Sequence, residues 1–138
     1  MSAKDVYHSL VRKALENEGW TITADPLFIR FLGVEMRIDL GGERVIAAEK
    51  DNEKIAVEIK SFLRTSAITE FHDALGQYMN YLDALDHLDP NRILYLAVPI
   101  DTYEIFFLSP YGQHVIQRYQ LKLIVYKTTH EEIVKWIQ

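Results

Sequence analysis

The segment KIAVEIKSF carries two oppositely charged side chains in a pattern that could do chemistry. Ile55, Val57 and Ile59 alternate with Glu58 and Lys60. This alternation is typical of a β-strand and places the carboxylate and the ammonium on the face opposite the apolar residues. A carboxylate can bind a divalent cation, and an ammonium can stabilise phosphate charge or assist an attacking water. The alternative is an ordinary ion pair on a solvated strand face.

A second carboxylate strengthens the chemical interpretation. Asp39 ends the strand-like segment MRID, 19 residues before Glu58, and is followed closely by Gly41 and Gly42. An aspartate and a glutamate in one pocket suit Mg²⁺, or Mn²⁺, with water and phosphate oxygens as the remaining ligands. The alternative role for Asp39 is that of a turn residue whose side chain hydrogen-bonds the local backbone.

Two polar residues lie on the long helix predicted after Ser66. Gln77 and Tyr81 are four residues apart in the stretch QYMNY and therefore lie on the same side of that helix. They flank its apolar stripe, where an amide and a phenol could hydrogen-bond a phosphate or Lys60. The alternative is an ordinary pair at the edge of the buried face.

The elements that must position these residues follow from periodicity and from helix start and stop signals. The sequence predicts an antiparallel meander, a long helix from Ser66 to Pro90, a buried strand, a helix after Ser109 and a further strand. A short helix is expected near Asp101, and the tail fits either a strand or a helix. The expected ranges are a helix over 4–18 and strands over 34–40, 44–50, 54–62, 92–98 and 121–127.

This order predicts one α/β domain over residues 1–138, with a mixed sheet between layers of helices.

The formal net charge of −5 argues against a purely electrostatic nucleic-acid binder, but it permits a metal-dependent nuclease or a protein with a basic partner. There is no cysteine, and the five histidines show no zinc-site spacing. No apolar run suggests a signal peptide or membrane span, so we expect a cytoplasmic protein. Trp20 and Trp136 are expected to fill the core or an interface.

The set Asp39, Glu58, Lys60, Gln77 and Tyr81, in the order helix, meander, helix, strand, resembles the PD-(D/E)xK nuclease superfamily, and its Q-x-x-x-Y helix is similar to that of RecB-type nucleases. Ile38-Asp39 stands where the superfamily usually has Pro-Asp. The resemblance implies a restriction-endonuclease-like α/β/α fold. It also implies a metal site made by Asp39, Glu58 and the main-chain carbonyl of Ile59, with Lys60 and Gln77 completing the catalytic set.

Further carboxylates stand as second-tier candidates. Glu49 would share the face of Glu58 if the intervening turn contains two residues, and a three-residue turn would reverse it. Glu16 and Glu18 close the first predicted helix. Because a glutamate of the first helix joins the metal site in several relatives of the superfamily, the resemblance makes either of them a candidate. A solvated helix end is the alternative.

A closer resemblance covers almost the whole chain. The stretches WTITADPL, IDLGGERVIAAEKDNEKIAVEIKSF, ALGQYMNYLDAL, RILYLAVP and LKLIVYKTTHEEIVKWI resemble the XisH proteins, the cyanobacterial fdxN element excision controlling factors. The resemblance implies a role in programmed DNA excision during heterocyst development, with a site-specific recombinase performing strand exchange and a companion protein, XisI, acting alongside. The expected protein is a Mg²⁺-dependent endonuclease-like factor that acts on DNA. The alternative is a non-catalytic DNA-binding or protein-docking module. A protein that acts on duplex DNA is expected to be compatible with a homodimer.

Overall fold

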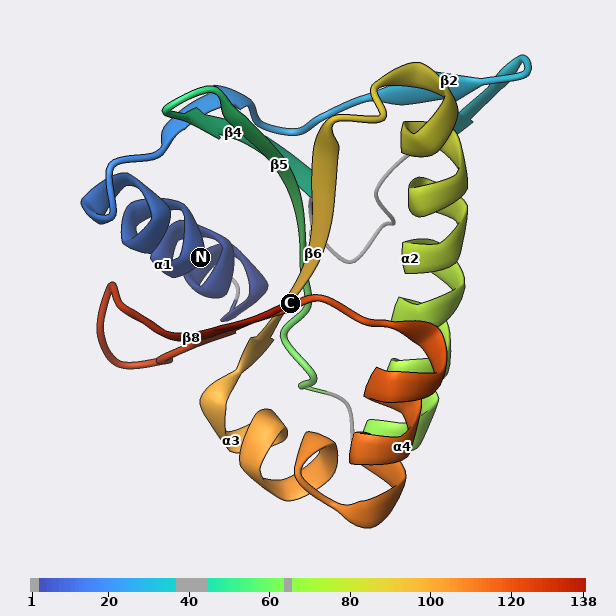
Figure 1. Cartoon of the computed structure of the whole chain (residues 1–138). Coiled ribbons are helices and arrows are strands. Elements are labelled where there is room, and N and C mark those ends of the chain that lie inside the picture. The colour runs from blue at the N-terminus through green and yellow to red at the C-terminus, as the bar shows by residue number, and fades with distance from the viewer. Residues whose placement is uncertain (1–2, 37–44, 64–65) are drawn as a thin grey trace.

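The computed structural model describes residues 3–36, 45–63 and 66–138 of the chain (Figure 1). Over these residues, helices and strands are mixed along the sequence, with five strands between the first two helices. In chain order they are α1 (Ala3–Asn17), β1 (Thr21–Ala24), β2 (Ile29–Phe31), β3 (Val34–Met36), β4 (Val45–Lys50), β5 (Glu53–Ile59), α2 (Ala67–Leu88), β6 (Arg92–Pro99), α3 (Ile100–Thr102), the π-helix η1 (Tyr103–Phe107), α4 (Pro110–Tyr119), β7 (Leu123–Tyr126) and β8 (Ile133–Ile137).

A mixed sheet of six strands forms the middle layer. The strand order is β1-β4-β5-β6-β7-β8, with β5, β6 and β7 parallel and the outer pairs antiparallel. Helix α1 covers one face, and α2 with α4 covers the other (Figure 1). The expected mixed sheet flanked by helices is therefore confirmed.

The predicted meander is only partly present. β4 and β5 form the expected hairpin, joined by Asp51 and Asn52, both of which have positive φ. The described part of the segment 34–40, however, pairs as β3 with β2 in a separate two-stranded sheet, and β1 lies beside β4 instead. The prediction that 34–40 joins this meander was wrong for these residues, because β1 already occupies that edge of β4.

The helix boundaries follow local signals in the sequence. The Ser66 side chain accepts a hydrogen bond from the amide of Thr69, and Ser109 caps α4 in the same way, with Pro110 in its first turn. Gly19, with φ of +95°, follows α1 at the position where a left-handed residue ends a helix. The short helix expected near Asp101 continues into a π-helix, and the ambiguous tail is strand β8.

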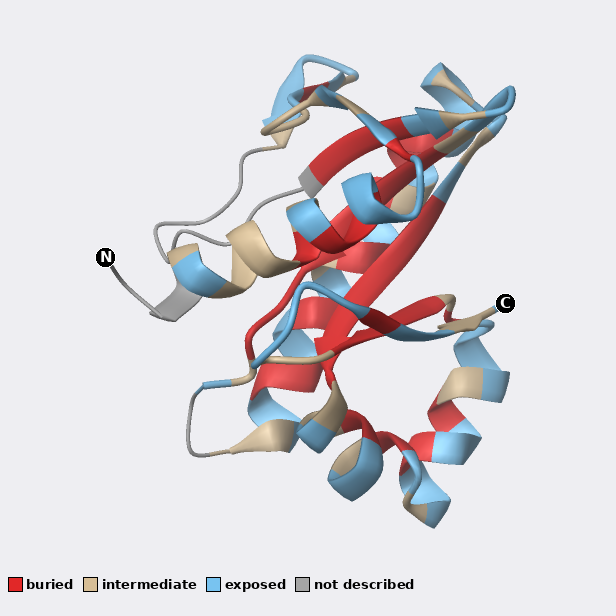
Figure 2. Cartoon of the chain, turned by 90° about the vertical axis from the view of Figure 1, so that its left-hand side faces the viewer, coloured by how far each residue is buried: buried red, intermediate tan, exposed pale blue. Residues whose placement is uncertain are grey.

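Two apolar layers enclose the central strands, which are buried on both faces (Figure 2). Val11, Ala14 and Leu15 of α1 pack on one face, and Phe71 and Tyr78 of α2 pack on the other. Among the described residues, no helix combines the length and apolar character needed to cross a membrane.

An ionic cluster ties the end of α2 to the start of the sheet. Asp89 accepts hydrogen bonds from the side chains of Lys54 (2.6 Å) and Arg92 (3.0 Å), and Arg92 also donates to the carbonyl of Ile55 (3.0 Å). The hydrogen bond from Lys54, followed by that from Arg92, holds the pKa of Asp89 below its usual value. The cluster therefore fixes the register between the α2–β6 turn and the beginning of β5.

Candidate active site

Glu58 and Lys60 lie at the carboxyl end of β5, on the face of the sheet that α2 covers. Ile55, Val57 and Ile59 pack in the layer under α1, as the alternation predicts, so Glu58 and Lys60 point the other way. That face is not solvated: Glu58 is 2% exposed and Lys60 8%. The interpretation as an ion pair on a solvated strand face is therefore wrong. Helix α2 covers this face of the sheet and excludes solvent from Glu58 and Lys60.

The two charges form a buried pair with a fixed backbone. The Nζ atom of Lys60 lies 4.0 Å from Oε2 of Glu58. The amide of Lys60 donates to the carbonyl of Ala97 (3.0 Å), and its carbonyl accepts from the hydroxyl of the buried Tyr126 (2.9 Å). Bonds to β6 and β7 thus hold Lys60 just beyond the last residue of β5.

Tyr78 connects this face of the sheet to α2. Its hydroxyl donates to the carbonyl of Leu94 (3.4 Å) and accepts from the amide of Lys122 (3.3 Å). Burial raises the pKa of Tyr78, and the negative charge of Glu58 adds to this effect. The phenol of Tyr78 therefore stays protonated. Its hydroxyl lies close enough to Glu58 to be affected by the carboxylate charge.

The polar side of α2 carries one acid that sequence reasoning missed. Glu70, Gln77 and Tyr81 are spaced seven and four residues apart, so they share one flank of the helix. Glu70 and Tyr81 are 7% and 5% exposed, which shows that this flank faces the protein interior. The spacing to Gln77 was the available signal for Glu70, but a glutamate in a first helical turn resembles ordinary helix-end stabilisation.

Glu70 lies near the level of Lys60 along the strands. Tyr78 is level with Leu94, to which it is hydrogen-bonded. Glu70 precedes Tyr78 by eight residues, which is about 12 Å along the axis of α2. Because α2 runs antiparallel to β6, this distance corresponds to about three or four residues further along β6. This places Glu70 near the level of Ala97, the residue that accepts the amide of Lys60. Gln77 directly precedes Tyr78, so along the axis of α2 it lies about 1.5 Å closer to the middle of the strands.

Two further metal ligands, Asp39 and the carbonyl of Ile59, are predicted. Asp39 lies outside the described residues. Ile59 directs its side chain into the layer under α1, and as the residue between Glu58 and Lys60 it retains the position of the expected carbonyl ligand. Within the described ranges, no group of three or more histidine, cysteine, aspartate or glutamate residues gathers closely enough to hold a metal ion.

The second-tier glutamates lie away from Glu58. The two-residue turn puts Glu49 on the same sheet face, but opposite Lys54, about 13 Å before Glu58 along β5. Glu16 and Glu18 are exposed at the end of α1, on the other side of the sheet. The Glu18 carboxylate accepts a hydrogen bond from the indole of Trp136 (3.1 Å). The structure thus groups Glu58 and Lys60 at the end of β5 and separates these three from them.

Comparison with known proteins gives the family. The family model described as "XisH protein" matches residues 1–134. The chain belongs to the XisH family. A crystal structure of an XisH family protein from Nostoc punctiforme PCC 73102 is 49% identical, with a TM-score of 0.90, and the match covers 97% of this chain and 100% of that one. No curated protein matches.

A second XisH-like structure carries a more informative description. It is a "fdxN element excision controlling factor protein" from Anabaena variabilis, 47% identical, with a TM-score of 0.89, and the match covers 97% of this chain and 99% of that one. The expected family resemblance is therefore confirmed. Two solved relatives also share the arrangement of the sheet and helices described above.

The buried pair has a definite chemical capacity. Glu58 offers carboxylate oxygens and Lys60 offers an ammonium at the same strand end, with Glu70 on the helix that covers them. Carboxylates supply the oxygen ligands of hard divalent cations, and an ammonium beside them can bind a phosphate oxygen or a water. Both charges lie in a low-dielectric setting, where electrostatic interactions act more strongly than at the surface.

Proposed function

We propose that this XisH protein controls the programmed excision of a DNA element as a Mg²⁺-dependent, endonuclease-like factor acting on DNA phosphodiesters. The observation that carries the proposal is the burial of Glu58 and Lys60 together at the end of β5. A buried ion pair is weakly justified by stability, because apolar residues of similar volume usually serve at least as well. A catalytic role at this strand end would explain why the sequence has a buried ion pair there and not two apolar residues.

The arrangement of elements supports assignment to the PD-(D/E)xK fold. Helix α1 covers one face, the β4–β5 hairpin leads into α2 on the other face, and α2 returns the chain to β6, which is parallel to β5. The Glu-x-Lys segment stands at the end of the hairpin's second strand, and Gln77 and Tyr81 stand on the crossover helix, as in the RecB-type signature.

The donor chemistry fits Mg²⁺ or Mn²⁺. Such ions are bound through one or two carboxylates, with water and phosphate oxygens as the other ligands. Glu58 supplies one carboxylate, and Asp39 and the carbonyl of Ile59 are assigned by the resemblance, with Glu70 as a further acid on α2. When bound, the cation would offset the charge that develops on the phosphodiester and activate a water.

The protein's own side chains have separate tasks in this proposal. Lys60 donates to a phosphate oxygen or to the attacking water, and its backbone bonds to Ala97 and Tyr126 fix where the ammonium can reach. Glu58 lies beside the ammonium and holds it at the strand end by electrostatic attraction. Gln77 hydrogen-bonds the phosphate or steadies Lys60.

A second candidate function is favoured by two observations. The net charge of −5 opposes binding to a polyanion, and the exposure of only 2% at Glu58 and 8% at Lys60 restricts access to both. In this alternative the nuclease-like frame is a non-catalytic module that binds DNA or docks an XisI-type companion and a site-specific recombinase, with or without dimerising.

Plasmid nicking distinguishes the two functions. Supercoiled plasmid is incubated with wild-type protein, Lys60→Met, Glu58→Gln and Glu49→Gln in Mg²⁺, Mn²⁺ or EDTA, with and without the companion protein. We expect nicking by the wild type and by the Glu49→Gln control, loss in the other two variants, and loss in EDTA. Equal nicking by Glu58→Gln and wild type, or none under any condition, would reject the catalytic function and leave the docking module.

A further inference from the structure

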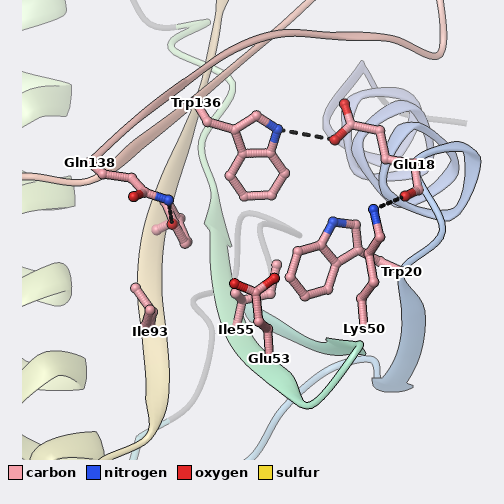
Figure 3. Close-up of a pocket in the computed structure, with 9 residues that line it drawn as sticks. Glu18, Trp20, Lys50, Glu53, Ile55, Ile93, Trp136 and Gln138 are labelled. Carbon is pink, nitrogen blue, oxygen red and sulfur yellow. Dashed lines mark hydrogen bonds between the residues drawn. The ribbon is translucent and has the colours of Figure 1, made fainter.

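A second site lies on the α1 side of the sheet, away from Glu58 and Lys60. It is a cavity of about 170 Å³ lined by residues between α1 and β1, by residues of β4, β5, β6 and β8, and by Gln138 (Figure 3). Ile55 and Ile93 form part of its floor at the beginning of β5 and β6, whereas Lys60 follows the end of β5, about 16 Å away along the strand. We call it the tryptophan pocket.

Aromatic rings from distant parts of the chain form its walls. The indoles of Trp20 and Trp136 stack with centroids 5.9 Å apart and an angle of 29°, and Tyr95 meets Trp136 edge-on at 5.1 Å. The ammonium of Lys50 already lies over the Trp20 ring, 5.9 Å from its centroid. Indole faces attract cations, and this intrachain contact uses that property.

Most of the polar groups in the pocket are engaged within the chain. The Trp136 indole donates to Glu18, Lys50 donates to the Glu18 carbonyl, and Gln138 donates to the Tyr95 hydroxyl (2.9 Å). Over the described part of the chain, no side-chain hydrogen bond or ion pair joins the carboxylate of Glu53, which faces the pocket (Figure 3). Burial raises the pKa of Tyr95, and the charge of Glu53 adds to this effect, so Glu53 lies within electrostatic reach of the Tyr95 hydroxyl.

Size and charge define the ligand. Small-molecule pockets usually measure about 300–1,000 Å³, so this cavity fits one side chain rather than a nucleotide. Glu18 and Glu53 against Lys50 give the lining a net negative charge. Among side-chain cations, a guanidinium is planar, stacks on aromatic rings and pairs with a carboxylate through two parallel hydrogen bonds. An ammonium lacks both the plane and the fork.

We propose that the tryptophan pocket binds an arginine side chain of a basic protein partner, with the guanidinium paired to Glu53 and lying against the indole wall. The net charge of −5 complements such a partner. This site is separate from the Glu58–Lys60 site and does not depend on the proposed nuclease function.

The chain provides its own reporter for this proposal, because its only two tryptophans line the pocket. The full-length protein is titrated at low salt with a capped arginine tripeptide, Gly-Arg-Gly, while tryptophan emission is recorded. Matched peptides with lysine or citrulline in place of arginine test the charge and the planar fork. Low salt is needed because exposed charges are otherwise screened.

We expect a saturable emission change with the arginine peptide, weaker binding of the lysine peptide and no binding of the citrulline peptide. Glu53→Gln should weaken arginine binding by about tenfold or more, since charged hydrogen bonds are lost. The matched control is Glu49→Gln, which removes the same charge from the same hairpin but on the other face of the sheet. Both positions are exposed, so both variants should fold.

Three results would overturn the proposal. One is an unsaturable or absent emission change at millimolar arginine peptide. Another is equal binding of the citrulline peptide, which would assign the pocket to neutral groups. The last is an equal loss of affinity in Glu53→Gln and Glu49→Gln, which would show that peptide binding depends on the overall charge of the protein and not on Glu53.

Discussion

The buried Glu58–Lys60 pair allows a quantitative prediction about stability. Replacing Lys60 with Met leaves the Glu58 carboxylate in a site where it is only 2% exposed, without its ammonium 4.0 Å away. At this separation the attraction between two unit charges is about 4 kcal/mol for an effective dielectric constant of about 20. Removing one member of a buried pair typically costs about 3–5 kcal/mol. We therefore expect the free energy of unfolding of Lys60→Met to fall by about 3–5 kcal/mol.

The double variant should behave differently from either single variant. Glu58→Leu should be destabilised about as much as Lys60→Met, because it leaves a buried ammonium. Glu58→Leu/Lys60→Met removes both charges and should lie near wild-type stability, or exceed it by up to about 1–4 kcal/mol. A wild type that is less stable than the double variant would show that the pair is kept at a cost in stability, as expected for a functional site.

The assay is urea unfolding at pH 7, followed by far-ultraviolet circular dichroism, with the four proteins forming a double-mutant cycle. In thermal unfolding of the same proteins, a fall of about 4 kcal/mol should lower the midpoint temperature by roughly 10–20 °C in a chain of this size. If the two single effects simply add in the double variant, Glu58 and Lys60 are not coupled, and the account of them as one unit is refuted.

Three further predictions concern the frame around the two sites. Asp89→Asn should destabilise the protein at pH 7. Because the pKa of Asp89 is lowered in the folded state, the difference from wild type should shrink in unfolding experiments as pH falls below about 4. Gly112→Ala should lower the free energy of unfolding by about 2 kcal/mol or more, since a Cβ would lie 2.1 Å from a backbone oxygen, whereas Gly76→Ala, with open space, should raise it by about 0.5–1 kcal/mol. Tyr126→Phe should lose about 1 kcal/mol in urea unfolding, because the hydrogen bond from the Tyr126 hydroxyl to the carbonyl of Lys60 is removed.

Local features were the most predictable from the sequence. The alternation around Glu58 gave the faces of β5, and the caps at Ser66 and Ser109 gave the starts of two helices. The two-residue turn after Lys50 is also a local property, because it needs only residues that tolerate positive φ. These signals lie within a few residues of the structure that they specify.

Non-local features were less predictable. The pattern over 34–40 predicts an extended segment but not the strand that it will join, and here β1 takes the edge of β4. The charges of Glu58 and Lys60 suggested a solvated face, and only the packing of α2 shows that it is buried. The tryptophan pocket joins Trp20 to Trp136, a contact across almost the whole chain that no local pattern contains.

The central claim is tested most directly by calorimetric titration of Mg²⁺ into the wild-type protein, Glu58→Gln, Asp39→Asn and the control Glu49→Gln. The account predicts saturable binding to the wild type and to Glu49→Gln, and loss of binding in the other two variants while all four proteins remain folded. Absence of binding to the wild type, or unchanged binding in Glu58→Gln, would contradict the assignment of a metal site to the end of β5.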